Sequence, residues 1–312
     1  MSQSAAGTGT AVPITGAGSV VTVGTFDGVH RGHWRVLEEV RRRADAIGGP
    51  GVLVTFDPHP LRIVRPESAP QLLTTPVEKK EILAESGLQY AVFVRFTREL
   101  QHYSPERFVR DILLERLRVA ELVIGYDHGF GRDRSGDVDT LRRLGATEGF
   151  AVHVVPPVEA GASPISSSRI RAAVEAGDMR AAADGLGRPY SLRGVVVRGD
   201  GRGRGLGFPT ANIQVPESDK LIPAPGVYAV RGVLRSGPRD GVLHLGPRPT
   251  FPGSPPATEL HLFDFDGDLY GESVRVDFVD RLRDIHPFGT IEELVDAIRA
   301  DCEEARRRLA GE

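Results

Sequence analysis

Short apolar runs alternate with longer amphipathic stretches in the first half of the chain. Five of these runs have the length of buried strands, at residues 19–25, 51–56, 90–95, 122–125 and 151–155. The stretches between them follow a helical period, as in residues 33–47, where the apolar positions share one face. Shorter helices are expected over residues 166–176 and 179–186. Strands that alternate with helices predict an α/β domain built on a parallel sheet.

Beyond Pro189 apolar residues alternate with polar ones, and turns rich in Gly, Pro and Asp separate the segments. The alternating segments lie at residues 192–198, 226–233, 241–245, 258–265 and 272–279. This pattern predicts an antiparallel sheet or barrel, followed by an amphipathic helix over residues 291–309. We therefore expect a flexible tail over residues 1–18, an α/β domain over 19–186 and a barrel domain over 187–312.

Composition and charge narrow the class of protein. A chain of 312 residues has room for two domains, each with its own core. Its 39 basic and 42 acidic side chains nearly balance, which excludes a generally basic nucleic-acid coat. No apolar run approaches the roughly 18 residues of a membrane span, and residues 1–18 lack the Lys or Arg that open a secretory signal. Because Cys302 is the only cysteine, we expect a protein of the reducing cytoplasm without an intramolecular disulfide or a Cys-type zinc site.

The segment between the first strand and the first helix carries a pattern typical of phosphate binding. It reads Gly24-Thr25-Phe26-Asp27-Gly28-Val29-His30-Arg31-Gly32-His33. Backbone N–H groups at a helix N-terminus bind phosphate, and Gly32 has no side chain that would hold a ligand away. His30 and His33 add donors that can grip a triphosphate and stabilise charge on its α-phosphoryl group as pyrophosphate leaves. Asp27 could act through a hydrogen bond or a metal contact, and the sequence leaves both open.

A second phosphate-binding pattern opens the helix expected at residues 166–176. It reads Ile165-Ser166-Ser167-Ser168-Arg169-Ile170-Arg171. The serine hydroxyls can cap a helix, and the guanidinium of Arg171 can hold phosphate through two hydrogen bonds. Alone this segment would be only a helix cap. Together with the H-x-G-H turn, in a five-stranded α/β unit, it completes the pattern of an adenylyltransferase.

The second domain opens on glycines at every other position, followed by a Pro-Thr-Ala-Asn segment. The glycines are Gly199, Gly201, Gly203, Gly205 and Gly207, and the segment ends with Thr210 and Asn212. Glycines let a backbone approach phosphates closely because no Cβ intervenes, although the spacing is not that of a Walker A loop. In an extended segment Thr210 and Asn212 point to one side, so their oxygens can share a Mg²⁺ with nucleotide phosphates.

Glu259 is the candidate general base of this second domain. A kinase that acts on an alcohol benefits from a carboxylate beside the acceptor hydroxyl. In Thr258-Glu259-Leu260-His261-Leu262 the alternation places Glu259 and His261 on one face of a strand and the leucines on the other. A solvated strand residue is the alternative role for Glu259.

On these motifs the chain resembles the prokaryotic bifunctional riboflavin kinase/FAD synthetase family from Thr22 to Cys302. Further matches are Thr55-Phe56-Asp57-Pro58-His59-Pro60, Glu78-Lys79-Lys80, Gly125-Tyr126-Asp127-His128-Gly129-Phe130-Gly131 and Leu269-Tyr270-Gly271-Glu272. The resemblance implies a nucleotidyltransferase-like domain of Rossmann type and a riboflavin kinase barrel. Whether His59 contacts a ligand or only forms a turn stays open.

The resemblance also implies two reactions and the residues that serve them. In the barrel, ATP phosphorylates riboflavin to FMN, with Glu259 as base and Mg²⁺ on Thr210 and Asn212. In the first domain a second ATP adenylylates FMN to FAD with release of pyrophosphate, and His30, His33 and Arg171 neutralise the phosphates. Nucleotide and flavin contacts are implied for Gly24, Phe26, Asp27, Gly32, Asp127, Ser166 and Ser167, and for Gly199, Gly205 and Gly207 in the barrel. No nucleic-acid or membrane partner is expected, and the oligomeric state stays open.

Two alternative functions stay open at this point. A departure from the family pattern such as His128, where the family usually has an aromatic residue, would fit an enzyme with only one of the two activities. A flavin-binding regulator without turnover is the other alternative. Both sets of charged and metal-binding residues are present, which binding alone would not need.

Overall fold

The computed structural model describes residues 14, 16–126, 129, 137–161, 163–216, 219–250 and 253–311. Its contacts divide the chain into two compact units, Met1–Ser167 and Ser168–Glu312. The expected tail over residues 1–18 lies outside the described residues, apart from Ile14 and residues 16–18. Within the described ranges no helix is both long enough and apolar enough to cross a bilayer.

The first unit is built on a five-stranded parallel sheet with the order β3-β2-β1-β4-β5. Its strands are β1 (Ser19–Val23), β2 (Gly51–Asp57), β3 (Tyr90–Arg95), β4 (Val119–Gly125) and β5 (Ala151–Val155). The strand order reverses between β1 and β4, and α/β proteins bind ligands at the carboxyl ends of strands that flank such a point. The prediction of a parallel α/β domain is confirmed.

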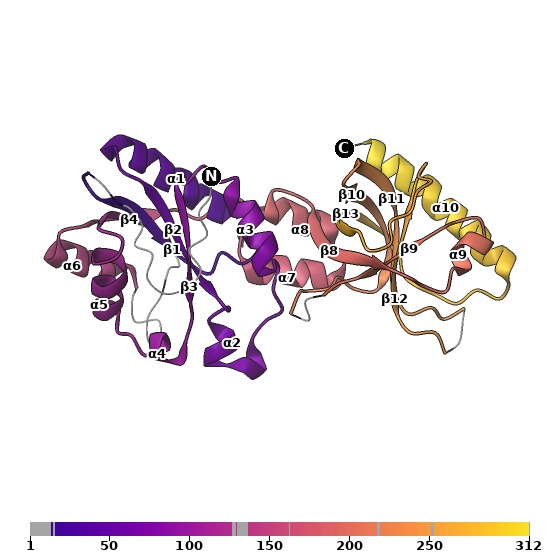
Figure 1. Cartoon of the computed structure of the whole chain (residues 1–312), viewed down its shortest axis with the longest axis horizontal. Coiled ribbons are helices and arrows are strands. Elements are labelled where there is room, and N and C mark those ends of the chain that lie inside the picture. Colours follow the sequence, from indigo (N-terminus) through magenta and orange to yellow (C-terminus); the bar gives the residue numbers. More distant parts are fainter. Residues whose placement is uncertain are drawn as a thin grey trace. The chain divides into compact units, whose positions relative to one another are not determined.

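Helices cover both faces of this sheet (Figure 1). The helical elements are α1 (Arg31–Ile47), α2 (Leu61–Val64), η1 (Pro66–Ser68), α3 (Pro76–Ala84), α4 (Arg98–Gln101), α5 (Pro105–Phe108), the π-helix η2 (Val109–Leu114) and α6 (Val138–Glu148). Successive strand residues point to opposite faces, so Val20 packs with α1 whereas Val21 belongs to the cluster formed with α5 and α6. A short hairpin of β6 (Glu159–Ala160) and β7 (Ser163–Pro164) follows the sheet.

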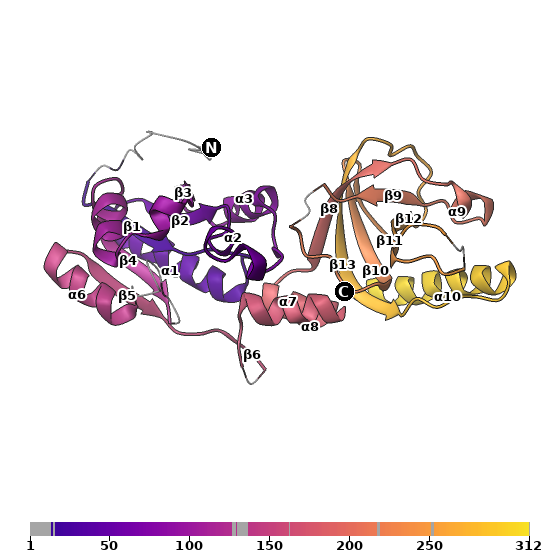
Figure 2. The same ribbon diagram turned by 90° about the horizontal axis from the view of Figure 1, so that it is seen from below.

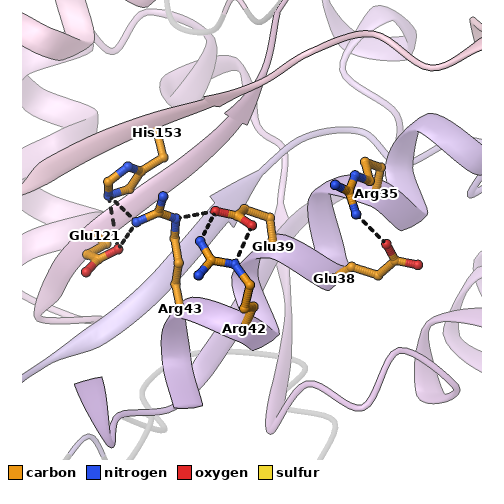
Figure 3. A network of polar contacts seen from close by, with 7 residues as sticks. All are labelled: Arg35, Glu38, Glu39, Arg42, Arg43, Glu121 and His153. Atoms are coloured by element: carbon orange, nitrogen blue, oxygen red, sulfur yellow. Dashed lines mark hydrogen bonds and ion pairs between the residues drawn. The ribbon is translucent and has the colours of Figure 1, made fainter. Parts of the chain in front are cut away.

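A network of charged side chains ties α1 to the sheet (Figure 3). Arg43 of α1 donates to Glu39 Oε1 at 2.6 Å and to Glu121 Oε2 of β4 at 3.0 Å. Nε2 of His153 on β5 lies 3.0 Å from that Glu121 oxygen and 2.9 Å from Arg43 Nη1. Burial, helped by the charge of Arg43, lowers the pKa of His153 below 6.5. Hydrogen bonds from Arg42 and Arg43 lower the pKa of Glu39 to about 2. The network therefore fixes the helix whose N-terminus carries the H-x-G-H turn.

Two helices, α7 (Ser167–Ala176) and α8 (Met179–Leu186), precede the barrel strands. Both pack on the second unit: the Ala224 N–H donates to the Val174 carbonyl at 3.4 Å, and Arg180 of α8 lies 2.7 Å from Asp280. The contacts therefore group both helices with the barrel, although the sequence pattern changes only after them, near residue 187.

Six antiparallel strands close into a barrel with the order β10-β11-β12-β9-β8-β13 (Figure 2). They are β8 (Tyr190–Val197), β9 (Ala211–Gln214), β10 (Gly226–Leu234), β11 (Gly237–Gly246), β12 (Ala257–Leu262) and β13 (Ser273–Arg283). Helix α10 (Ile291–Ala310) packs on the outside through Ala305 and Leu309, which contact the cluster of Val227 and Val242. The predicted barrel and terminal helix are confirmed.

One strand end expected for the barrel was wrong. The strand expected over residues 258–265 ends at Leu262, because the chain turns at Asp264, which adopts a left-handed φ of 53°. The glycine run contains one helical turn, α9 (Arg202–Gly205).

Candidate active sites

The H-x-G-H turn caps α1 with its own two histidines. His30 is the N-cap, and its Nδ1 accepts the His33 N–H at 3.3 Å. Nδ1 of His33 accepts the His30 N–H at 3.2 Å in return, and the two rings stack with centroids 3.6 Å apart. Because both Nδ1 atoms are acceptors, the proton of each neutral ring lies on Nε2. The turn thus presents two Nε2–H donors where the helix dipole also attracts phosphate.

Side chains pack closely around the turn, and this packing leaves little room for a Cβ at Gly24 or Gly32. The Phe26 ring is one of the packed groups. A Cβ at position 32 would lie 3.1 Å from His30 Cε1, so Gly32 makes room for the stacked imidazole. Phe26 adopts a φ of 48°, and its ring lies 4.8 Å from that of His33. A Cβ at position 24 would lie 2.9 Å from the Phe26 ring. The structure therefore brings Gly24, Phe26 and Gly32 together around the histidine pair.

Asp27 is buried beside the turn, and its carboxylate holds a neighbouring loop. Its oxygens accept the backbone N–H groups of Leu73 at 3.2 Å and Thr74 at 3.1 Å, and the Thr74 hydroxyl at 3.3 Å. The Ser167 hydroxyl donates to the Asp27 carbonyl at 3.0 Å, which brings the serine pattern to the H-x-G-H turn. These contacts favour a hydrogen-bonding role for Asp27, one of the two roles that the sequence left open.

Lys79 is a buried cation in the Glu78-Lys79-Lys80 segment, and the sequence pattern indicates no chemical role for it. Its side chain reaches from α3 and donates to the Thr25 carbonyl, just after β1, at 2.9 Å. Only 7% of Lys79 is exposed, and this burial lowers its pKa, while the charges of Asp27 and Asp57 act in the opposite direction. The lysine adds positive potential at the carboxyl end of β1, where an anionic ligand of the turn would lie.

Ser166, Arg171 and Asp127 complete the set of residues predicted for the adenylyltransferase site. Ser166 immediately precedes α7, and Arg171 lies on α7 in the second unit. Asp127 and His128 lie outside the described residues, so the expected flavin contact there stays a prediction. His59 Nδ1 accepts the Leu61 N–H at 3.2 Å, as a turn histidine would.

A cavity of the second unit brings the two barrel motifs together. Its lining includes Arg202 and Gly203 of the glycine run, Thr210, and Glu259 and His261 of β12. Residues of α10 close another side, among them Cys302, whose thiol pKa burial raises to about 11. Such a thiol stays protonated near neutral pH and is a poor nucleophile.

The glycine run lies directly against the Thr-x-Asn segment. A Cβ at position 199 would lie 2.1 Å from Asn212 Nδ2, and one at position 203 would lie 3.1 Å from Thr210 Oγ1. Asn212 and Glu259 are partners in the β9–β12 register. No group of three or more His, Cys, Asp or Glu that could hold a metal occurs among the residues described. A hydroxyl, an amide oxygen and nucleotide phosphates are donors that suit Mg²⁺, which keeps several waters.

Glu259 lies on the cavity face of β12, opposite the buried Leu260 and Leu262. Its Oε1 is 3.4 Å from Arg248 Nη1, and its register partner on β11 is His244. Burial lowers the pKa of His244, while the charge of Glu259 opposes that shift. The Glu259 carboxylate thus lies beside the Arg248 guanidinium and next to the Thr-x-Asn segment.

Comparison with known proteins matches the two units to two enzymes. A family model described as FAD synthetase matches residues 13–169, and one described as riboflavin kinase matches residues 186–309. The chain is 39% identical to a bifunctional riboflavin kinase/FMN adenylyltransferase of Pseudomonas fluorescens, over 94% of each chain. The chain belongs to the bifunctional riboflavin kinase/FMN adenylyltransferase family.

Other relatives in the bifunctional riboflavin kinase/FMN adenylyltransferase family match over nearly the same length. The protein from Escherichia coli K12 is 37% identical, over 91% of this chain and 90% of its own. That from Bacillus subtilis is 34% identical, over 93% of this chain and 92% of its own. The crystal structure of a macrolide-efflux protein from Streptococcus pneumoniae has a TM-score of 0.85 at 32% identity and covers 94% of this chain and 95% of its own.

Proposed function

We propose that this chain makes FAD from riboflavin in two steps, one in each unit. Riboflavin and ATP give FMN and ADP in the barrel, and FMN and a second ATP give FAD and pyrophosphate in the α/β unit. The observation that carries the proposal is the gathering of Thr210, Glu259 and the glycine run around one cavity. Membership of the bifunctional family and the histidine-capped turn support the second step.

In the kinase step we assign Glu259 as general base. Its carboxylate accepts the proton of the ribityl hydroxyl while that oxygen bonds to the γ-phosphorus, and the bond from this phosphorus to ADP breaks. Gly199, Gly205 and Gly207 let the phosphates approach the backbone. Thr210 and Asn212 would hold Mg²⁺, which neutralises phosphate charge when bound.

In the adenylyl step an oxygen of the FMN phosphate bonds to the α-phosphorus of ATP, and the bond to pyrophosphate breaks. The Nε2–H groups of His30 and His33 donate to phosphate oxygens as their charge grows. We assign phosphate binding to Arg171 as well, and nucleotide or flavin contacts to the other predicted residues of this unit, Gly24, Phe26, Asp27, Gly32, Asp127, Ser166 and Ser167. Asp27 acts here by shaping the turn.

A domain boundary and a cellular location complete the proposal. We place the boundary between the catalytic domains near residue 187, because the sequence pattern changes there and the riboflavin kinase match begins at residue 186. We place the reactions in the cytoplasm, because the single cysteine suits a reducing compartment.

A chromatographic product assay with Mg²⁺ and ATP, started separately from riboflavin and from FMN, tests the two steps. The unaltered protein should form FMN and FAD from riboflavin, and FAD from FMN. Glu259→Ala should lower FMN formation by at least about 100-fold and leave FAD formation from FMN unchanged, because a general base is worth that factor. The double variant His30→Ala, His33→Ala should do the reverse. Loss of both steps in either folded variant, or flavin binding without any turnover, would contradict the assignment.

A further inference from the structure

Arg248 is a nearly buried cation that lines the barrel cavity, and neither of the two proposed reaction steps involves it. It follows β11, and only 11% of its side chain is exposed. Its Nη1 lies 3.4 Å from Glu259 Oε1 and 3.4 Å from Asp200 Oδ2, and its Nε donates to the Pro255 carbonyl at 3.3 Å. One guanidinium therefore contacts both the general base and the glycine run.

The contact with Asp200 continues into the glycine run. Arg202 Nη2 lies 3.2 Å from the same Asp200 oxygen, and Arg202 Nη1 donates to the Ser254 hydroxyl at 3.0 Å. Acidic and basic side chains alternate in this series of contacts, which runs from Glu259 through Arg248 and Asp200 to Arg202. All four residues belong to the second unit. A displacement of the glycine run by bound phosphates would therefore reach the base through Arg248.

We propose that Arg248 is a positioning residue that orients the Glu259 carboxylate and links its position to the glycine run. This inference rests on the proposed kinase function of the barrel. A guanidinium that holds Oε1 restricts the rotation of the Glu259 side chain and leaves Oε2 to receive the ribityl proton. Because Arg248 and Glu259 have only 11% and 21% of their side chains exposed, water screens their attraction less than at the surface.

Among the described residues, the two register partners of Glu259 do not supply such a cation at neutral pH. His244 faces Glu259 across the strand pair, but its pKa is lowered by burial. Asn212, the partner of Glu259 on the other side, is neutral. The 3.4 Å separation of Arg248 from Glu259 is long for a hydrogen bond, as is common before substrate binds, when such contacts have not yet tightened.

The first test is the substitution Arg248→Gln, assayed separately for both reactions. The kcat of FMN formation should fall about 10- to 100-fold, the value of a hydrogen bond to a charged group, while KM for riboflavin changes less than about threefold. FAD formation from FMN should be unchanged, because it takes place in the other unit, and thus reports on folding. Arg275→Gln, which removes a more exposed arginine that pairs with Asp277 on β13, is the matched control and should leave both reactions unchanged. A kcat of FMN formation like that of the unaltered protein would overturn the proposal.

Arg248→Lys keeps the charge but loses the forked geometry, so it should recover part of the lost kcat. If Arg248→Gln does not fold, Arg248→Lys serves as the test instead. A lowered kcat of FMN formation with normal FAD formation supports the proposal. An unchanged kcat in Arg248→Lys, with Arg248→Gln unfolded, would overturn it.

A double-variant cycle separates positioning of Glu259 from a general structural effect. If Arg248 acts through Glu259, Arg248→Gln should change the residual kcat by less than about twofold once Glu259→Gln is in place. Effects that multiply in the double variant would overturn the proposal. If Glu259→Gln alone forms FMN at the normal rate, Glu259 is not the general base. The single variant is measured before the double variant, so this outcome is distinguished from failure of the positioning role.

Discussion

At the scale of single residues, His33 combines an observed role in capping α1 with a proposed role in phosphate binding. Its Nδ1 completes the cap of α1 by accepting the His30 N–H, a task that Glu or Gln performs in the usual capping box. Its Nε2–H is one of the two donors proposed for the phosphates of ATP. A side chain that keeps the acceptor but lacks the imidazole donor should therefore keep the helix and lose the reaction.

We predict that His33→Gln is close to the unaltered protein in stability, within about 0.5 kcal/mol, whereas His33→Ala costs about 1 kcal/mol through the lost cap. Both variants should slow FAD formation from FMN by at least about tenfold, since neither has the imidazole Nε2–H donor and the Gln amide, whose oxygen would cap the helix, holds its NH2 group at a different position. Urea unfolding followed by the fluorescence of Trp34, the only tryptophan and a residue of α1, measures the stability of this unit. Normal FAD formation by His33→Gln would show that capping is the only function of His33.

Residue type, local spacing and the family resemblance together made His30, His33, Thr210, Asn212 and Glu259 candidates, and their roles stay predictions. The hydrogen-bond partners of Asp27 were not predictable, because they lie 46 and 47 positions later in the chain. The same holds for Lys79, which meets the Thr25 carbonyl across 54 positions. Contacts between residues so far apart leave no periodic signal in the sequence.

At the scale of elements, two strands and one helix were predicted to the residue, whereas the one-turn helices were not predicted. Residues 90–95 and 151–155 coincide with β3 and β5, and residues 179–186 with α8. The four-residue helices α2, α4 and α5 are only about one turn long, too short for a helical period to show. The end of β12 depends on the left-handed φ of Asp264, which a non-glycine residue seldom adopts.

The network that holds α1 on the sheet predicts a pH dependence of stability. His153 is a base whose pKa in the folded state lies below its unfolded value of 6.5. The unfolded chain therefore binds the proton first as the pH falls through 6.5, and the first unit should lose stability in that window. The midpoint of urea unfolding, followed by Trp34 fluorescence, should be lower at pH 5.5 than at pH 7.5.

His153→Gln should reduce this loss, since it removes the titrating ring. The exposed His102 of the same unit provides the control, because His102→Gln should keep the full acid loss. An equal drop in His153→Gln and in the unaltered protein would assign the pH dependence to other groups.

At the scale of the whole molecule, each unit has its own hydrophobic core and its own proposed reaction. Leu122 belongs to the core of the α/β unit, and Leu243 is buried in the barrel unit. Matched truncations of these two leucines therefore test whether each core supports only the reaction of its own unit.

We predict that Leu122→Ala and Leu243→Ala each destabilise their own unit by about 2 to 5 kcal/mol, the usual cost of a buried leucine. On mild heating Leu122→Ala should lose FAD formation from FMN before FMN formation from riboflavin, and Leu243→Ala should show the opposite order. Activity remaining after timed incubation at increasing temperature measures both. Simultaneous loss of the two activities in both variants would mean that the units do not unfold separately.

The different closure of the two sheets has a consequence for aggregation. Every strand of the barrel has a neighbour on both sides, whereas β3 and β5 are the outermost strands of the parallel sheet. An outermost strand leaves one row of backbone N–H and C=O groups available to a strand from another chain. Arg95 at the end of β3 and His153 within β5 are polar residues of the kind that oppose such pairing. When molecules of this protein aggregate by adding strands to one another, growth should begin on the α/β unit, and the barrel should be incorporated last.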